Sequence, residues 1–298
     1  MCTHLLGLDS KIYEHPEDRK TLQALTSMKG FDHVVSAFLN WTGVKANYVI
    51  HKGSSYHVTE DSCPELFHLV KEAASILDVA DLPRVYLEWN YGINGYTTGY
   101  KETTMMVLNT GVIDLMSDME QTFVIGHELG HIKSKHVIYH TMGSLLTNFI
   151  SEVPIIGFIS DKLFSIALMR WSRMSEFTAD RAGLLACQDL DAAMKAIIKM
   201  SGVPGRYFDR INVDAFLREA EDFEKELSTT DRAWEKAINL FSNDHPWTVI
   251  RALELKRWVD SGAYDRILEN NSSVICRVCH GENLHGSVTC EYCGSDLV

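Results

Sequence analysis

The chain has 298 residues and a formal net charge of −12 at neutral pH. That length can bury one sizeable core and carry a small additional module. No run of Lys or Arg supplies the clustered positive charge that nucleic-acid binding needs, so nucleic acid is not expected as a partner. The N-terminus lacks a positive region followed by an apolar stretch, which argues against a secretory signal.

The first part of the chain predicts helices alternating with short strands. We expect helices over residues 17–40 and 64–78, a hairpin of strands 45–50 and 55–59 around a turn at 51–54, and further strands over 84–89 and 104–109. Residues 91–100 are rich in Gly, Asn and Thr, which indicates either a loop or an irregular edge strand.

The rest of the chain predicts mostly helix. We expect helices over 117–140 and 170–188, an interrupted apolar region over 145–169, and an almost wholly helical region over 190–268 with breaks at 202–205, 242–246 and 261–262. The expected fold class is therefore α+β, mainly helical, with a small mixed sheet. Residues 1–270 are expected to form one domain and residues 271–298 a separate Cys-rich module.

The segment His127-Glu128-Leu129-Gly130-His131 fits the pattern H-E-x-x-H. On a helix, residues four positions apart lie on one face, so both imidazoles can reach one metal ion and Glu128 can face a metal-bound water. The flanking residues are apolar, and two buried histidines and a carboxylate without partners would be costly. The pattern predicts zinc bound by His127 and His131, with Glu128 as general base. A chance match among core residues is the alternative.

A third ligand is needed, and its position separates the classes of zinc peptidase. The pattern H-E-x-x-H-x-x-G-x-x-H is absent, because Ser134 and Val137 stand where its Gly and third His would be. On a continuous helix His136 and His140 point away from His131, so we expect them to be polar-face residues. The remaining choice is a carboxylate from a later helix.

The segment Glu176-Phe177-Thr178-Ala179-Asp180 supplies such a carboxylate. Glu176 and Asp180 share a helix face, so Glu176 can bind the metal while Asp180 accepts a proton from the outer nitrogen of a ligand histidine. The small residues that follow suit close packing against another helix, whereas a solvated helix with surface acids is the alternative. Three protein ligands leave a fourth zinc position for the water that Glu128 would deprotonate during peptide hydrolysis.

Together, the sequences HELGH and SRMSEFTADRAGL resemble the gluzincin zinc peptidases, which include the HtpX-type heat-shock proteases and the CaaX prenyl proteases. The resemblance covers roughly residues 84–258 and includes the segment MMVLNTGVIDLM at 105–116. It implies a zincin-like domain and zinc-dependent endopeptidase activity on peptide or protein substrates.

The resemblance also implies roles for residues outside these motifs. Asn94-Gly95-Tyr96 is similar to the family's Asn-Ala-Phe before the edge strand of the cleft, which implies that these residues bind the extended backbone of a substrate. His245-Pro246 is similar to a His-Pro of the family whose His lies near the zinc. His245 would donate to the developing oxyanion or block the metal in a resting state. A His at a helix start followed by Pro is the structural alternative.

Four of the seven cysteines form two Cys-x-x-Cys pairs near the C-terminus: Cys276, Cys279, Cys290 and Cys293. This spacing predicts a zinc ribbon with a structural zinc ion, with rubredoxin-like iron or two disulfides as alternatives. Because the ribbon has few basic residues, a protein partner fits it better than nucleic acid. Thiolate ligands indicate a reducing compartment, so a cytoplasmic location is expected.

Many members of the resembled family span a membrane between the two zinc motifs, where residues 145–169 lie here. Charged residues interrupt this segment, and a span needs about 20 largely apolar residues. We expect instead a helical hairpin that covers the cleft and touches a membrane surface. Two further interpretations stay open: a non-catalytic scaffold that recruits partners through the ribbon, and a membrane-associated quality-control protease.

Overall fold

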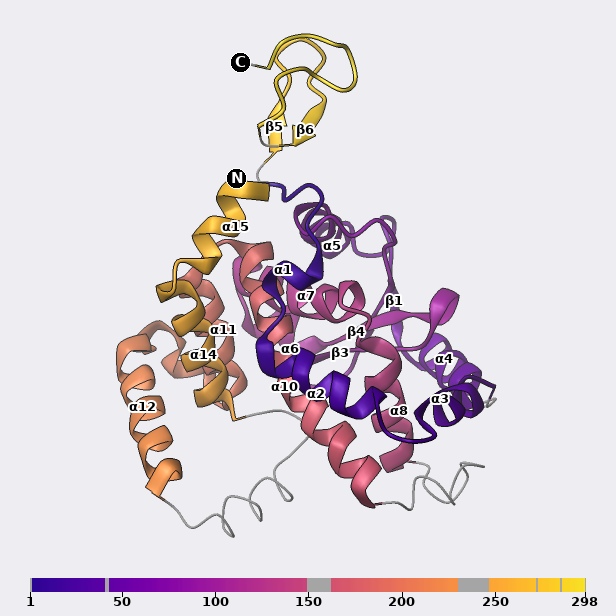
Figure 1. Cartoon of the computed structure of the whole chain (residues 1–298). Coiled ribbons are helices and arrows are strands. Elements are labelled where there is room, and N and C mark those ends of the chain that lie inside the picture. The colour runs from indigo at the N-terminus through magenta and orange to yellow at the C-terminus, as the bar shows by residue number, and fades with distance from the viewer. Residues whose placement is uncertain are drawn as a thin grey trace.

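The computed structural model describes residues 2–40, 43–148, 162–229, 247–271, 273–284 and 286–297. Helices surround a small mixed sheet, which confirms the expected fold class (Figure 1). The helices are α1 (Ser10–Tyr13), α2 (Pro16–Thr26), α3 (Phe31–Asn40), α4 (Gly43–Ser54), α5 (Pro64–Ile76), α6 (Thr110–Leu115), α7 (Asp118–Lys133), α8 (Val137–Asn148), α10 (Lys162–Cys187), α11 (Leu190–Met200), α12 (Val213–Thr229), α14 (Thr248–Asp260) and α15 (Ala263–Asn271), with short 3-10 helices at Lys101–Thr103 and Gly205–Arg210.

The sheet has the strand order β1 (Tyr56–Val58), β2 (Arg84–Glu88), β4 (Met105–Asn109) and β3 (Gly95–Thr98). β2 and β4 are parallel, whereas β1 pairs with β2 and β3 pairs with β4 in antiparallel fashion. All five residues of β4 are buried, as expected for an apolar central strand. β3 lies at the edge of the sheet, which confirms the edge-strand alternative for this segment.

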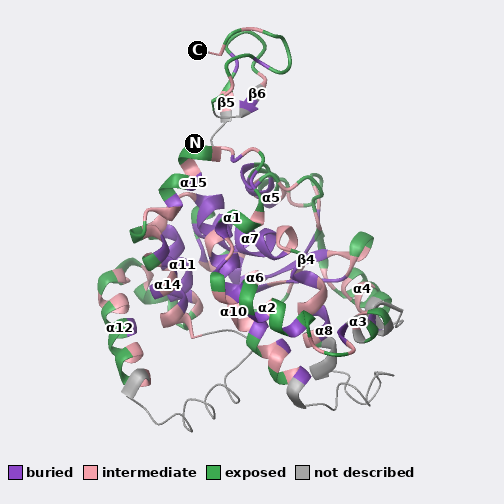
Figure 2. Ribbon diagram, in the orientation of Figure 1, coloured by how far each residue is buried: buried purple, intermediate pink, exposed green. Residues whose placement is uncertain are grey.

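Helices α7 and α10 pack against each other through small residues. A Cβ atom added at Gly130 would lie 2.5 Å from the Cβ of Ala182, and one added at Gly183 would lie 2.7 Å from the carbonyl oxygen of Phe123. The two helices can therefore approach closely only because these positions lack larger side chains. This confirms the predicted packing role of the small residues after Asp180, and Figure 2 shows α7 and the second half of α10 largely buried.

Two predicted elements in the N-terminal part are wrong. Residues 17–40 form two helices, α2 and α3, because the chain turns at Gly30, whose φ of 87° is readily adopted by glycine. Residues 45–50 belong to helix α4 and not to a hairpin strand. Tyr48 of α4 packs against buried residues of the sheet, so contact with the sheet outweighs the strand preference of this Tyr-Val-Ile segment.

The predicted helix over 117–140 is also interrupted. α7 ends at Lys133, Lys135 adopts a φ of 60°, and α8 begins at Val137. The expected breaks near Gly202 and Gly262 are present, both at glycines with positive φ, whereas the break at 242–246 lies outside the described residues.

The N-terminal segment lies along α10 (Figure 1). The backbone N–H of His15 donates to Thr178 Oγ1 at 3.0 Å, and Arg181 donates to the carbonyl oxygens of Tyr13 and Glu14. These contacts bring the start of α2 to the helix that carries Glu176.

Two helices, α8 and the start of α10, occupy the described parts of the predicted hairpin at 145–169, and residues 149–161 lie outside the described residues. Across the helices that the structure does describe, none combines the length and apolar character needed to cross a bilayer.

Candidate active site

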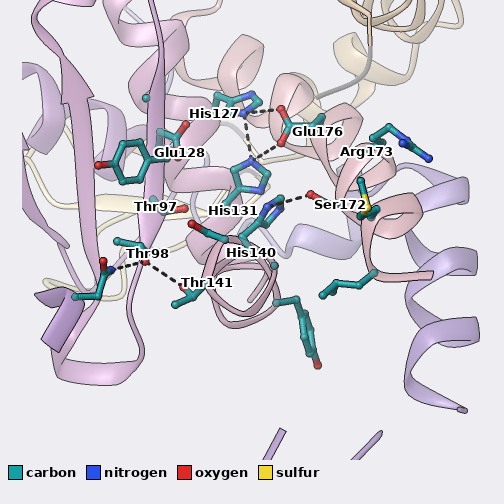
Figure 3. A pocket seen from close by; sticks show the side chains of 18 of the residues that line it. Thr97, Thr98, His127, Glu128, His131, His140, Thr141, Ser172, Arg173 and Glu176 are labelled. Carbon is teal, nitrogen blue, oxygen red and sulfur yellow. Dashed lines mark hydrogen bonds and ion pairs between the residues drawn. The ribbon is translucent and has the colours of Figure 1, made fainter. Parts of the chain in front are cut away.

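Three side chains from α7 and α10 meet at the base of a cavity of about 430 Å³. His127 Nε2 lies 3.2 Å from His131 Nε2, and Glu176 carboxylate oxygens lie 3.5 Å from His127 Nε2 and 3.3 Å from His131 Nε2. Zinc bonds of about 2.0–2.1 Å in a tetrahedron place ligand atoms about 3.3 Å apart, so this donor set fits zinc. Figure 3 shows the three side chains turned toward one another.

Local sequence explains how α7 presents its two histidines. Ser117 and Glu120 form a capping box at the start of the helix, and each satisfies a backbone N–H of the first turn. About two and three turns after Glu120, His127 and His131 share the face that meets α10.

Glu128 lines the same cavity and is 3% exposed. Gly95 at the start of β3 lies directly against it, because a Cβ at Gly95 would lie 3.4 Å from Glu128 Oε1. The cavity therefore runs between edge strand β3, with Thr97 and Thr98, and helix α10 (Figure 3). A carboxylate in this position can exchange protons with a water or a substrate in the cavity.

A buried ion pair supports His127 from behind. His127 Nδ1 lies 3.0 Å from Asp180 Oδ1, and Arg251 of α14 donates to both Asp180 oxygens at 2.6 and 2.9 Å. Burial disfavours ionised Asp180, but Arg251 and His127 hold its pKa below the usual value. Asp180 is thus a carboxylate that accepts from His127, which leaves Nε2 of this ring for a metal.

The electrostatics of the site favour positive charge at His127. Burial would lower the pKa of this imidazole, but Asp180 and Glu176 raise it to about 10. For His131 burial dominates, and the neighbouring His127 and His136 add to it, so its pKa falls to about 4 despite Glu176. Two carboxylates facing the histidine pair therefore suit a bound cation.

The expectation for His136 and His140 is wrong. Because the helix breaks at 134–136, His136 turns back into the core, where it is 1% exposed, with Nδ1 lying 3.2 Å from His131 Nδ1. His140 lines the cavity, and its ring centroid lies 4.6 Å from that of His131. Neither residue sits on a polar face.

Of the three residues expected to bind substrate, Gly95 and Tyr96 begin β3 and Asn94 directly precedes it. Gly95 and Tyr96 line the main cavity, and Tyr96 donates through its hydroxyl to Glu88 at 2.7 Å. Asn94 lines a small adjoining pocket beside Glu128, and its carbonyl accepts from the backbone of Asn109. His245 lies outside the described residues, so its role stays a prediction.

Sequence reasoning missed Arg251 and Asp18. A signal existed for Arg251: it stands in the apolar run Thr-Val-Ile-Arg-Ala-Leu and shares a helix face with the buried Leu255 and Trp258. Asp18 offered no such signal, because it sits in a charged stretch and its burial depends on contacts more than 100 residues away.

The four C-terminal cysteines gather beside the antiparallel strands β5 (Ser273–Ile275) and β6 (Glu282–Leu284). Their Sγ atoms all lie within 4.8 Å of one another, and the closest pairs are 3.5 and 3.6 Å apart. All four are free thiols, so the disulfide alternative is not found. The arrangement suits one tetrahedral metal ion with sulfur ligands.

Comparison with known proteins places this geometry in a family. The model of peptidase family M48 matches residues 62–259. A plastoglobule-localised chloroplastic metallopeptidase 48 of Arabidopsis thaliana is 30% identical over 274 residues, 91% of this chain and 79% of that protein. A protease HtpX homologue of Burkholderia multivorans is 27% identical over 241 residues, 73% of this chain and 82% of that protein. No solved structure matches.

The family match spans more than half of the chain and contains both zinc-binding motifs, and the resemblance seen in the sequence is thereby confirmed. The chain belongs to peptidase family M48, a family of zinc metallopeptidases.

Proposed function

We propose that this chain is a zinc-dependent endopeptidase in which His127, His131 and Glu176 hold the zinc and Glu128 is the general base. The observation that carries the proposal is the spacing of the three ligand atoms, 3.2–3.5 Å, at the base of a cavity lined by Glu128. Family membership and donor chemistry both support zinc as the metal.

Zinc bound there supplies Lewis acidity, which activates a water and polarises the scissile carbonyl. Glu128 accepts the proton of the attacking water and delivers it to the leaving amine. Asp180 fixes the ring of His127, and Arg251 keeps Asp180 ionised. His245 is proposed either to donate to the oxyanion or to block the metal at rest.

The substrate is proposed to bind as an extended strand along β3. β3 lies at the edge of the sheet and its Gly95 adjoins Glu128, so a peptide paired with β3 would pass the general base. Asn94, Gly95 and Tyr96 are the proposed substrate-binding residues.

The proposed C-terminal module, residues 271–298, would hold a structural zinc ion through Cys276, Cys279, Cys290 and Cys293, with iron as the alternative. We propose a protein partner for this module, because Val278 and Tyr292 of its surface are 68% and 70% exposed. Residues 1–270 are the proposed peptidase domain.

Two alternative functions stay open. One is a scaffold that recruits partners without catalysis, and the other is a quality-control protease at a membrane surface that residues 145–169 would touch. A cytoplasmic location is proposed from the thiol ligands, whereas the name of the Arabidopsis relative points to plastoglobules for that protein.

Chelation separates catalysis from a scaffold role. We expect the purified protein to cleave an unfolded casein substrate, to lose cleavage when a strong chelator removes zinc, and to regain it when zinc is added back. The measurement is the rate of peptide release in each state. Absence of chelator-sensitive cleavage in a zinc-loaded sample would favour the scaffold.

A further inference from the structure

A buried line of polar groups lies behind His131 and ends on a carboxylate of the N-terminal segment. His131 Nδ1 lies 3.2 Å from His136 Nδ1, and His136 Nε2 lies 3.3 Å from Asp18 Oδ2. His136 is 1% exposed and Asp18 is fully buried. Asp18 belongs to α2, outside residues 62–259 that match the family, so the line joins this segment to the metal site.

Hydrogen-bond chemistry fixes the direction of each contact in this line. Nε2 of His131 is the atom that faces His127 and Glu176, so Nδ1 carries the proton when Nε2 binds a metal. His131 Nδ1 then donates a hydrogen bond, and His136 Nδ1 accepts it. Its other nitrogen, Nε2, carries a proton and donates to Asp18.

Asp18 is held by neutral donors. Trp171 Nε1 donates to Asp18 Oδ1 at 2.9 Å, and Thr178 Oγ1 donates to Oδ2 at 2.6 Å. Thr178 itself accepts from the backbone N–H of His15, so it has its hydroxyl proton to give. A buried carboxylate needs such donors. The third donor to Asp18 is the ring of His136, which also contacts the proposed metal ligand His131.

We infer that Asp18 and His136 are positioning residues for zinc: they hold the ring of His131 in the orientation and tautomer that present Nε2 to the metal. The inference rests on the proposed function only in taking His131 as a ligand. It means that the two histidines are supported differently, His127 directly by Asp180 and His131 through a second imidazole.

A second metal ion at His131, His136 and His140, whose ring nitrogens also lie within 4.8 Å of one another, fits the contacts less well. The two ring nitrogens of His140 lie 3.3 and 2.9 Å from the hydroxyls of Ser172 and Ser175. His131 would also have to bind metal through both nitrogens, which requires the loss of its remaining ring proton.

The substitution Asp18→Asn tests the inference because an amide has one acceptor atom in place of two. If the NH₂ of this amide faced His136, Nε2 of His136 would have to accept, and the proton of that ring would move to Nδ1. Two N–H groups, those of His136 and His131, would then face each other. If the NH₂ of the amide faced Trp171, two donors would oppose each other there. Trp171→Phe removes the second conflict, so in the double variant the amide oxygen can accept from His136 and Thr178.

The measurement is the affinity of the metal-free full-length chain for Co²⁺, whose visible absorption reports its ligands. The near-ultraviolet thiolate band marks cobalt at the cysteine site and separates it from the histidine site. We expect Asp18→Asn and His136→Phe to weaken binding at the histidine site by about 10–100-fold. Trp171→Phe alone should keep nearly normal affinity, and the Asp18→Asn/Trp171→Phe double variant should recover most of the loss.

A purely structural role for Asp18 predicts the opposite pattern. Trp171→Phe would then lower the thermal stability of the Asp18→Asn variant further. The thermal unfolding of the metal-free protein would change in these variants while their cobalt affinity did not. Normal affinity in both Asp18→Asn and His136→Phe, or a double variant weaker than Asp18→Asn, would overturn the inference. No peptide substrate is used, so this result is independent of whether the protein proves to be a peptidase.

Discussion

Replacing Glu128 by Gln is expected to lower kcat/KM for peptide cleavage by about 10²–10⁴-fold, the usual contribution of a positioned general base. Gln cannot accept the proton of the attacking water, but it has nearly the same volume and is not among the three clustered ligand candidates. Zinc content should therefore stay at the wild-type level. Cleavage kinetics and metal analysis on the same sample measure both quantities.

Glu176→Gln is the matched control, because it makes the same chemical change in the same cavity. It replaces a proposed ligand, so we expect it to lose zinc from the histidine site as well as activity. Full cleavage by Glu128→Gln would remove the general-base assignment, and normal zinc content in Glu176→Gln would remove the ligand assignment.

Replacing Arg251 by Met is expected to lower the free energy of unfolding of the metal-free protein by about 3–5 kcal/mol, because it removes the guanidinium that donates to both oxygens of the buried Asp180 carboxylate and leaves that carboxylate with His127 as its remaining charged partner. Asp180 is 1% exposed and Arg251 is 5% exposed, so water cannot compensate. Arg251 and His127 hold the pKa of Asp180 below its usual value, so the ionised Asp180 stabilises the fold near neutral pH. This stabilisation is lost when the pH falls far enough to protonate Asp180 in the folded protein.

Arg257→Met provides the comparison on the same helix. Arg257 pairs with Glu224 and Glu254, but its side chain is 47% exposed, so we expect a loss of at most about 1 kcal/mol. Urea unfolding with a chelator present measures both variants. Equal losses would show that burial of the Arg251–Asp180 pair does not set its importance.

The zinc motifs could be predicted because helix periodicity alone places His127 beside His131 and Glu176 beside Asp180. The small residues of both helices also indicated that α7 and α10 could pack closely enough to bring the two motifs together. The edge strand at Gly95–Thr98 could be named only as an alternative to a loop, because its pairing with β4 depends on a partner strand.

The parts that failed depend on tertiary contacts. Val49 and Ile50 favour a strand by composition, yet the segment is helical with both side chains exposed, because Asn47, Tyr48 and His51 face the sheet and the cavity. The turn after Lys133 contains neither Gly nor Pro to mark it.

That unmarked turn decides the surroundings of the candidate metal site. On a continuous helix His136 would point away from His131, but the break lets it reach both His131 and Asp18. The contact with Asp18 spans 118 positions of the chain, so no local pattern could indicate it. His136, which lies between two helices, is thereby placed where it can support the proposed ligand His131.

The position of zinc itself is the most direct test of the central claim. Anomalous diffraction at the zinc absorption edge, from crystals of the zinc-loaded protein, should show one peak within about 2.0–2.2 Å of His127 Nε2, His131 Nε2 and a Glu176 oxygen. A second peak is expected among the four C-terminal cysteines. A peak centred between His131, His136 and His140, or none near His127 and Glu176, would contradict the account.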